Sequence, residues 1–578
     1  MTLRDRAVLG ILSLALVVLT GAVVAPSFMP EAPSETPGPS LPPTRPYVEG
    51  VLGMAASVSP FSARTAAERA IVALMFRGLV RLGPDDTVIG DLAERWDVDA
   101  TGATWTFHLR DGLTWHDGQP LTSADVLFTI SALSDLEYTG PGAASWREVT
   151  ATAPDDRTVV LTLATPLGGF LHAATQPIAP VHLLGGVTPI DLPDDEFGVR
   201  PVGSGPFRLS ELDADHAVLV PAIAELLDPD DGVPGGGTPR PTDSLTTPAP
   251  TPRSGTPLPY LEAIELRFFD DAETLAAAWN AGDLDAASGL APEAAAELAE
   301  TDGARLLRYP TTTLLAVTLN LRPSHPEFRD AAVRRALLAA IDRDAIVRTV
   351  LARQASRADA PIPPTSWAFD AASSPPVAFD PAAARAGLTA AGWTEAAAGG
   401  WTPKGATAPL AFELLCPEEA ANPASYGVAE AIAEAWRGIG LSVTLRPLPG
   451  AELIGDHLRA GQFSAVVTGL GIGLDPDLYP LLASSQVTAS GSNFAGLQDP
   501  ALDPLLVAAR APGTDEVRKA AYLALQARLA TGVYLLPIAF RDEVVVVRDT
   551  LEGPEIRPIG SPGDRFWDVL TWRLADGR

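Results

Sequence analysis

The side chains that could perform chemistry in this chain are few, and their spacing does not match the patterns that catalysis or metal binding needs. The 578 residues include seven histidines, without a His-x-x-x-His or Cys-x-x-Cys pair, and a single cysteine, Cys416. A disulfide framework and a cysteine-based metal cluster are therefore excluded, and no dedicated metal site is indicated. Because the neighbours of Cys416 are apolar or acidic, we expect a small buried side chain rather than a nucleophile.

Two short motifs resemble catalytic arrangements only superficially. Gly203-Ser204-Gly205 places a serine between glycines, but it lacks the G-x-S-x-G spacing of a nucleophile turn, and Pro206 stands where the following helix would begin. His116-Asp117 lies in a stretch typical of a hairpin turn, which favours a turn-forming role over acid–base catalysis. A G-x-x-x-x-G-K-[ST] phosphate loop is also absent from the sequence, so ATP hydrolysis would have to occur in another chain. We therefore expect a protein without catalysis, metal or cofactor, and keep a hydrolase as the alternative from a different class.

The elements that would hold functional side chains are clearest in residues 71–130. Apolar residues recur at helical spacing before a turn and predict a helix with one apolar face: Ile71, Leu74, Met75 and Leu79. In residues 104–110 apolar and polar residues alternate, which predicts a strand with one buried face. Thr122 stands three residues before Asp125, which predicts a capped helix N-terminus. Together these patterns indicate a mixed α/β protein.

Length and charge limit the architecture and the partners. A chain of 578 residues is too long for one core of about 250 to 300 residues, so at least two lobes are expected, and 47% of the residues are hydrophobic and can fill them. With 71 acidic against 41 basic residues, the net charge is -30. Such a charge repels phosphates, which argues against nucleic-acid binding, and it favours solubility.

The N-terminus addresses the chain to a membrane. Arg4 and Arg6 precede an uncharged run at residues 7–25, which as a helix would span about 28 Å, close to the thickness of a bilayer core. The positive charges favour this end inside and the bulk of the chain outside the cell. Residues 1–25 are either a removed signal peptide or an uncleaved anchor, because small residues precede Pro26, yet proline is a poor residue after a cleavage site.

Two tracts have a composition that cannot supply a packed core. Residues 26–46 are rich in Pro, Ser, Thr and Glu and predict a linker between the membrane and the folded body. Residues 229–257 form a second tract of this kind inside the folded region, and predict a disordered insert at the surface.

Several segments resemble one known family. LAERW followed by WTFHLRDGLTWHDGQPLTSADVLF is similar to the signature of the family 5 extracytoplasmic solute-binding proteins, the receptors of ABC importers for dipeptides, oligopeptides and nickel. Other segments resemble further motifs of the family: residues 201–207, 278–285, 328–344 (FRDAAVRRALLAAIDRD), 379–393 and 436–445, and Asn493 followed by residues 503–506. The resemblance covers roughly residues 47–578.

The resemblance implies an α/β fold with two lobes, the periplasmic-binding-protein fold of the large peptide-binding type, with a hinge and a ligand cleft between the lobes. Lobe I would take residues 47–310, lobe II residues 311–537, and residues 538–578 would return to lobe I. Two strands near residues 309–320 and 535–547, both rich in Thr, Val, Leu and Ile, would form the hinge. Two bodies joined in this way can close around a ligand, and contacts made only in the closed state favour closure.

The resemblance also points to a ligand-binding segment at residues 469–477. Peptide binders of the family place a Trp and an Asp there, and the Asp pairs with the α-amino group of the peptide. In this chain the candidates of the segment are Gly469, Leu470, Gly471 and Ile472. The aromatic position falls near Gly469 and the acidic position on Ile472, so we expect ligands with a blocked, modified or absent amino terminus, or an amine held by Asp475. The competing role of Asp475 is to begin a turn and a helix at Pro476.

Five further residues are candidates for the cleft: Ser59 and Phe61 from the exit of the first strand, Trp146, Trp367 and Asn493. Aromatic side chains in a cleft can hold varied ligand groups through apolar area, and packing inside a lobe is the competing explanation. Asn493 could hydrogen-bond an extended ligand or cap a loop.

These observations predict the extracytoplasmic receptor of an ABC importer, a monomer that binds a peptide or peptide-like ligand. Its partners would be the permease and ATPase subunits of the importer and the membrane, through the N-terminal helix, but not nucleic acid. The alternatives are a binder of a metal chelate or an oligosaccharide, a sensor or peptide-holding chaperone on the same scaffold, and an extracytoplasmic hydrolase.

Overall fold

The computed structural model describes residues 45–575, except for residues 85–86, 139, 223–260, 397–398 and 489–490. Arg45–Arg578 form one compact unit. The predicted membrane segment at residues 7–25, the linker apart from its last two residues, and the insert at residues 229–257 lie outside the described residues. In the part of the chain that is described, no helix combines the length and the apolar character needed to cross a membrane.

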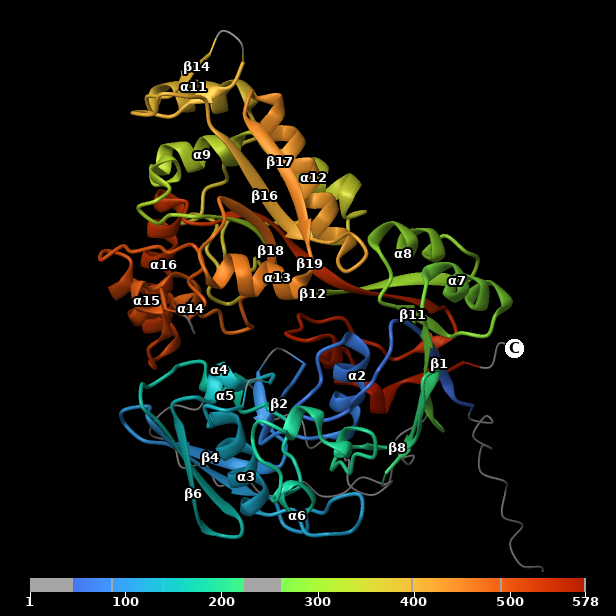
Figure 1. Ribbon diagram of the computed structural model, residues 1–578. Coiled ribbons are helices and arrows are strands. Elements are labelled where there is room, and N and C mark those ends of the chain that lie inside the picture. The colour runs from blue at the N-terminus through green and yellow to red at the C-terminus, as the bar shows by residue number, and fades with distance from the viewer. Residues whose placement is uncertain are drawn as a thin grey trace, which may run out of the picture. The chain divides into compact units, whose positions relative to one another are not determined.

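One mixed sheet of eleven strands joins segments between residues 47 and 548 (Figure 1). Its order is β17-β16-β18-β12-β19-β11-β1-β10-β9-β8, and β13 pairs with β19 beside this path. The strands are β1 (Tyr47–Leu52), β8 (Phe207–Leu212), β9 (His216–Pro221), β10 (Ile264–Phe269), β11 (Ala286–Ser288), β12 (Ala304–Leu319), β13 (Ala355–Arg357), β16 (Ala411–Pro417), β17 (Ser442–Leu448), β18 (Ala465–Gly471) and β19 (Leu536–Arg548).

The long strands β12 and β19 pair with each other and link the two halves of the sheet. β18 pairs with β12 at residues 313–319, whereas β11 pairs with β19 at residues 545–547, so the two ends of the ladder hold different neighbours. The ladder is interrupted in between: from the pair Pro310–Asp542 to the pair Leu314–Phe540, three residues of β12 face the single residue Arg541. Such a bulge bends the strand that carries the extra residues.

Hydrophobic packing divides at this bulge. One large core uses residues 314–540, and another uses residues 47–309 together with residues 545–572. We call the part around the second core lobe I and the part around the first core lobe II. The two hinge strands predicted from the sequence coincide with β12 and β19. The division of the cores supports the predicted lobe boundaries at 310/311 and 537/538, which we retain as a proposal.

Helices and smaller sheets complete both lobes. In lobe II, α12 packs on β16, β17 and β18, whereas α7 packs on β1, β10 and β11 and α8 packs on β12 and β19. The described helices are α2 (Ala66–Met75), α3 (Ser123–Ser134), α4 (Ala143–Trp146), α5 (Phe170–Ala173), α6 (Val181–Leu184), α7 (Ala272–Ala281), α8 (Pro292–Ala299), α9 (Ala331–Ala339), α10 (Arg343–Ala345), α11 (Pro381–Ala390), α12 (Pro423–Gly438), α13 (Gly450–Glu452), α14 (Tyr479–Leu482), α15 (Asp503–Arg510) and α16 (Asp515–Gly532). The smaller sheets consist of β4 (Ala93–Val98), β5 (Thr104–Leu109), β7 (Thr158–Leu163) and β6 (Val149–Asp155), of β2 (Val80–Leu82) with β3 (Val88–Gly90), of β14 (Thr394–Glu395) with β15 (Trp401–Thr402), and of β20 (Leu551–Glu552) with β21 (Arg573–Leu574).

The local predictions for residues 71–130 are confirmed with one difference. β5 alternates buried and half-buried residues, as the sequence predicts. The side chain of Thr122 caps α3, and the Asp125 carboxylate accepts from the backbone N–H of Thr122 at 2.8 Å. The difference concerns Leu79, which the helical spacing places in the helix. In the structure α2 ends at Met75, because Phe76 takes an extended conformation, and Leu79 is buried just before β2.

The C-terminal return is held to the first strand by a buried ion pair. Arg565, in the short helix Pro562–Phe566, donates to both carboxylate oxygens of Glu49 on β1, at 2.6 and 3.0 Å. The hydroxyls of Tyr47 and Ser288 also donate to this carboxylate. Glu49 is fully buried, so these four donors supply the partners that a charge in a dry interior requires.

A second buried cation, Arg334 on α9, stabilises the end of α16 in lobe II. Its guanidinium donates to the carbonyls of Gly532, Val533 and Phe328, at 2.6, 2.9 and 2.7 Å. Val533 ends α16 with a φ of 47°, a conformation that a β-branched residue rarely adopts. Burial lowers the pKa of Arg334 to about 10, which leaves the side chain charged at neutral pH. The motif at residues 328–344 therefore contributes a structural charge to lobe II.

Replacing Arg334 should destabilise lobe II strongly. We expect Arg334→Met to lower the free energy of unfolding by about 3 kcal/mol, because three buried carbonyls lose their donors. The matched control is Arg335→Met at the next, exposed position, where the loss should stay below about 1 kcal/mol. Urea unfolding followed by circular dichroism measures both values, and equal losses for the two variants would contradict this role.

Candidate functional site

A cavity of about 780 Å³ lies where lobe I meets a turn of lobe II. Its wall is built from the end of α2, from β2, from residues around α4 and α5, and from residues 555–571 of the C-terminal return. Gly473 and Leu474, which follow β18, are the contribution of lobe II. The volume lies within the range of cavities that hold small ligands in proteins.

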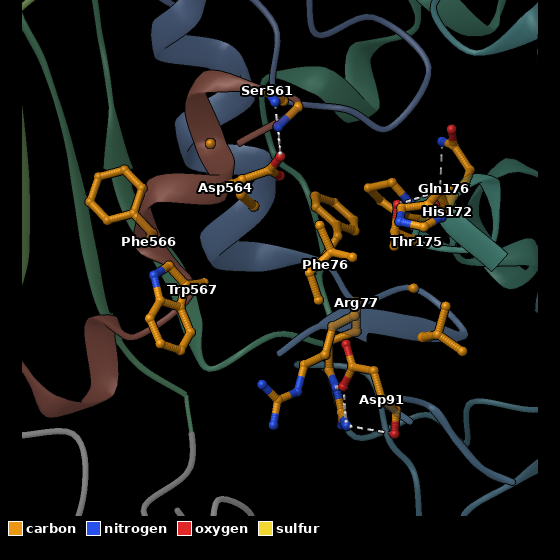
Figure 2. A pocket seen from close by; sticks show the side chains of 18 of the residues that line it. Phe76, Arg77, Asp91, His172, Thr175, Gln176, Ser561, Asp564, Phe566 and Trp567 are labelled. Atoms are coloured by element: carbon orange, nitrogen blue, oxygen red, sulfur yellow. Dashed lines mark hydrogen bonds and ion pairs between the residues drawn. The ribbon is translucent and has the colours of Figure 1, made fainter. Parts of the chain in front are cut away.

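Charged groups stand on different sides of this cavity, as Figure 2 shows. Arg77 donates from Nε to a carboxylate oxygen of Asp91 at 2.6 Å and from Nη2 to the Asp91 carbonyl at 3.1 Å. On another side, Oδ2 of Asp564 accepts from the backbone N–H groups of Gly560 and Ser561 at 3.0 and 2.8 Å. Burial raises the pKa of Asp564.

Asp568 is a second acidic group in the cavity wall, and only 8% of its surface is exposed. Its carboxylate accepts from the backbone N–H of Glu555 and from the indole N–H of Trp572, both at 2.7 Å. Burial outweighs these two hydrogen bonds and raises the pKa of Asp568 to about 6.

Four aromatic residues also line the cavity: Phe76, Trp146, Phe566 and Trp567. The Arg557 guanidinium lies over the Trp567 ring, 4.6 Å from its centroid. Apolar area with a few fixed polar groups is the composition typical of a binding cavity.

The backbone of β18 leads into the cavity from lobe II. β18 pairs with β16 only at Ala465 and Val466, so beyond Val466 this edge has no strand partner among the described residues. The N–H of Ile472 donates to Thr312 of β12 at 3.1 Å. Because backbone groups alternate along a strand, the N–H and C=O groups of Gly469 and Gly471 point to the open edge. Both glycines are exposed, whereas Leu470 is half-buried and packs against the core of lobe II.

Asp475 follows in the same turn, and its carboxylate is paired. Arg518 on α16 donates to both of its oxygens at 2.7 and 2.8 Å, and the two side chains are 8% and 11% exposed. The structure places a turn at residues 473–476, and the predicted start of a helix at Pro476 is wrong. α14 begins at Tyr479, whose N–H donates a hydrogen bond to the Asp477 carboxylate.

The motifs that superficially resembled catalytic sites have structural roles. The N–H groups of Ser204 and Gly205 both donate to the carbonyl of Met75, and a Cβ atom on Gly203 would collide with that carbonyl, so the glycine permits close packing under α2. His116 Nε2 contacts the carbonyl of Gly205 at 2.9 Å, and Asp117 lies in the turn that follows. Cys416 is buried, and burial raises its thiol pKa to about 11, as a structural cysteine requires.

The comparison with known proteins assigns the family. Residues 87–492 match the family described as "Bacterial extracellular solute-binding proteins, family 5 Middle". The chain belongs to this family. Protein XP55 of Streptomyces lividans is 30% identical over 465 residues, which are 79% of this chain and 76% of that protein. Membership in family 5 points to a binding role outside the cytoplasm.

Solved structures of family 5 share the fold. The oligopeptide-binding protein AppA from Bacillus subtilis, in complex with a nonapeptide, aligns with a TM-score of 0.71 at 22% identity over 92% of this chain and all of that chain. NikA from Brucella suis, in complex with Fe(III)-EDTA, aligns with a TM-score of 0.72 at 22% identity over 91% of this chain and all of that chain. The predicted two-lobed α/β fold is confirmed.

The remaining cleft candidates lie in different surroundings within this family 5 chain. Phe61 and Trp146 are buried in the core of lobe I, although Trp146 also reaches the cavity. The Ser59 hydroxyl accepts from the N–H of Phe61 at 3.2 Å, and Asn493 is buried and uses its amide to bind the carbonyls of Ala483 and Leu497. Contact of these residues with a ligand stays a prediction.

Two further candidates lie in lobe II. Ile472 is 3% exposed and belongs to the core of this lobe, so an ionised group at this position would be buried there. Trp367 is 39% exposed and has its ring under the Arg518 guanidinium, 4.7 Å away, and edge-on to Tyr522. Their contact with a ligand also stays a prediction.

Sequence reasoning missed most of the cavity wall. Arg77, Asp91, Asp564 and Asp568 were not among the candidates, because they come from segments whose meeting depends on the tertiary fold. Asp564 had a local signal, since Ser561 stands three residues before it, and this spacing predicts the capping box that the structure contains. That signal locates a short helix but not the cavity beside it.

The raised pKa of Asp568 predicts a pH-dependent cost to stability in this family 5 chain. The folded pKa of about 6 lies above the unfolded value of about 3.9, so the folded state binds the proton more tightly and loses stability as the pH rises through this window. We expect the stability of the wild type relative to Asp568→Asn to fall by about 2 kcal/mol between pH 4 and pH 7.

Urea unfolding of both proteins at pH 4 and pH 7 measures this difference. A lost hydrogen bond in the variant contributes at both pH values and cancels in the comparison. Asp302→Asn, at an exposed position, is the matched control, and the test compares its difference between the two pH values with that of Asp568→Asn. A difference that grows with pH in favour of the wild type would show that the pKa of Asp568 is lowered instead.

Proposed function

We propose that this protein is the solute-binding receptor of an ABC importer, and that it captures a peptide or peptide-like ligand in an extended conformation. The observation that carries this proposal is the open edge of β18 at Gly469 and Gly471, which leads into the cavity through Gly473 and Leu474. An extended peptide can add to such an edge through main-chain hydrogen bonds.

The residues at this edge fit recognition of many sequences. Gly469 and Gly471 have no side chains, so a ligand backbone can approach the strand closely. Main-chain hydrogen bonds are the same for every peptide sequence, and the aromatic wall of the cavity can hold varied side chains through apolar contact. AppA, whose structure contains a nonapeptide, shares the fold.

Capture would occur by closure of the lobes around the ligand. The cavity has walls from both lobes, and the lobes are joined by β12 and β19 with a bulge between their cores. A ligand that contacts both walls binds the closed state more tightly and shifts the equilibrium toward it. The loaded receptor would deliver its ligand to a membrane permease driven by a separate ATPase, and residues 7–25 would direct the chain across the membrane or anchor it there.

The second candidate is a metal chelate or another compact non-peptide solute. Arg77, Arg557 and the aromatic rings of the cavity offer a surface on which an anionic complex could bind. NikA, whose structure contains Fe(III)-EDTA, has the same fold.

Removing the backbone donor at Gly471 tests the peptide proposal. Gly471→Pro deletes the N–H that points to the open edge, and we expect at least tenfold less binding of an equimolar nonapeptide library, detected by native mass spectrometry. Gly471→Ala is the matched control: it keeps the N–H, and a Cβ atom there meets no atom within 4 Å, so binding should change little.

The outcomes separate the alternatives. Equal binding by the folded Gly471→Pro variant and the wild type would remove this edge as the peptide site. If the wild type retains nickel–histidine complexes or oligosaccharides but no nonapeptide, the second candidate replaces the first. Release of hydrolysed peptides would favour a hydrolase.

A further inference from the structure

We infer that Gly168 and Gly169 of lobe I form a seat for the Asp475–Arg518 ion pair of lobe II, and that this contact positions the lobes in the closed state. The inference deepens the proposed capture mechanism, and its effect on ligand affinity rests on that mechanism.

The two lobes meet at this point through the backbone. The N–H of Gly168 donates to the carbonyl of Arg510, at the end of α15, at 2.9 Å. A Cβ atom on Gly168 would lie 2.8 Å from Nε of Arg518 and 2.9 Å from the carbonyl oxygen of Ala511. A Cβ atom on Gly169 would lie 2.8 Å from Cγ of Asp475. Any side chain at these two positions would therefore push lobe II away.

The partner surface on lobe II is a fixed block. Asp475 and Arg518 hold each other by two hydrogen bonds and are almost buried, and the Trp367 ring lies against the guanidinium. Because both charged groups are restrained, they cannot move aside cheaply when a neighbour approaches. A further contact between Gly102 of lobe I and Pro512 of lobe II lies in the adjoining region, where a Cβ atom would come within 2.6 Å of the proline ring.

The glycine at position 169 serves this contact and not its own backbone. Its φ of -88° and ψ of 13° are accessible to any residue, so local conformation does not require a glycine. What requires it is the side chain of Asp475. Alanine at this position therefore tests the contact between the lobes without adding backbone strain.

This contact determines how deep the ligand site is. Asp475 shares its turn with Gly473 and Leu474, the residues through which lobe II closes the cavity. When lobe II closes, its movement ends where the ion pair meets the two glycines. The cavity wall formed by lobe II reaches its final position at the same point. The ion pair therefore acts as a positioning element for the binding cavity, in addition to any role in the stability of lobe II.

The distance between the lobes tests the inference without any ligand. Spin labels on Ile190→Cys in lobe I and Ile454→Cys in lobe II, both exposed positions, report this distance by pulsed electron–electron double resonance. The native Cys416 is buried and does not interfere. We expect Gly169→Ala to shift the distance distribution to longer values. Gly186→Ala, an exposed position where a Cβ atom meets no atom within 4 Å, should leave it unchanged.

A second-site change makes the test specific. Asp475→Gly removes the atoms that the new methyl group would meet, so the double variant Gly169→Ala/Asp475→Gly should return toward the wild-type distances. If the double variant does not fold, the comparison of Gly169→Ala with Gly186→Ala still tests the contact between the lobes. Identical distributions for these two single variants would overturn the inference.

Affinity for the nonapeptide library provides the functional readout. Gly169→Ala should bind about tenfold more weakly, because a smaller population of the closed state lowers the apparent affinity by the same factor. Longer distances without any peptide binding by the wild type would support the seat and contradict the peptide proposal. Unchanged distances together with normal peptide binding would contradict the seat and support the peptide proposal.

Discussion

The pairing of β12 with β19 is the constraint on which the rest of the structure depends. These strands are the pair that takes part in both cores, and their ladder carries β18 at one end and β11 at the other. A pair of hydrogen-bonded strands resists twisting and stretching but bends where its ladder is broken. The bulge opposite Arg541 supplies this break between the cores. The position of every residue in the cavity relative to lobe II is therefore determined by this ladder and by the contact at Gly168 and Gly169.

The same arrangement explains why charged groups near the cavity are paired in different ways. Asp475 is neutralised by Arg518 and presses on the opposite lobe, whereas Asp564 uses one oxygen for two backbone donors at the cavity wall. A carboxylate that one lobe places against the other must keep its partner in every state of closure. A carboxylate in the wall of a cavity can instead exchange partners with a ligand. The two acids therefore have different tasks although both lie near the cavity.

The sequence predicts the elements much better than the site. Alternation in residues 104–110 and the Thr122–Asp125 spacing predict their strand and helix start, because these signals lie within a few residues. The resemblance to the family also predicts the hinge strands. Local rules predict that Asp475 starts a helix, since they cannot detect that Arg518, more than forty residues away, pairs with it. The cavity wall joins residues near 77, near 175 and near 565. No local sequence pattern indicates that these distant segments lie close together in the fold.

The ion pair between Glu49 and Arg565 has a consequence for the order of folding. β1 is made early in synthesis, but the cation that neutralises Glu49 and the residues that complete the core of lobe I belong to the last thirty or so residues of the chain. All core residues of lobe II lie between residues 314 and 540, so they are synthesised before these C-terminal residues. Lobe I therefore cannot complete its core until the C-terminus has emerged, and an incomplete lobe I keeps the chain from reaching its final compact form during synthesis.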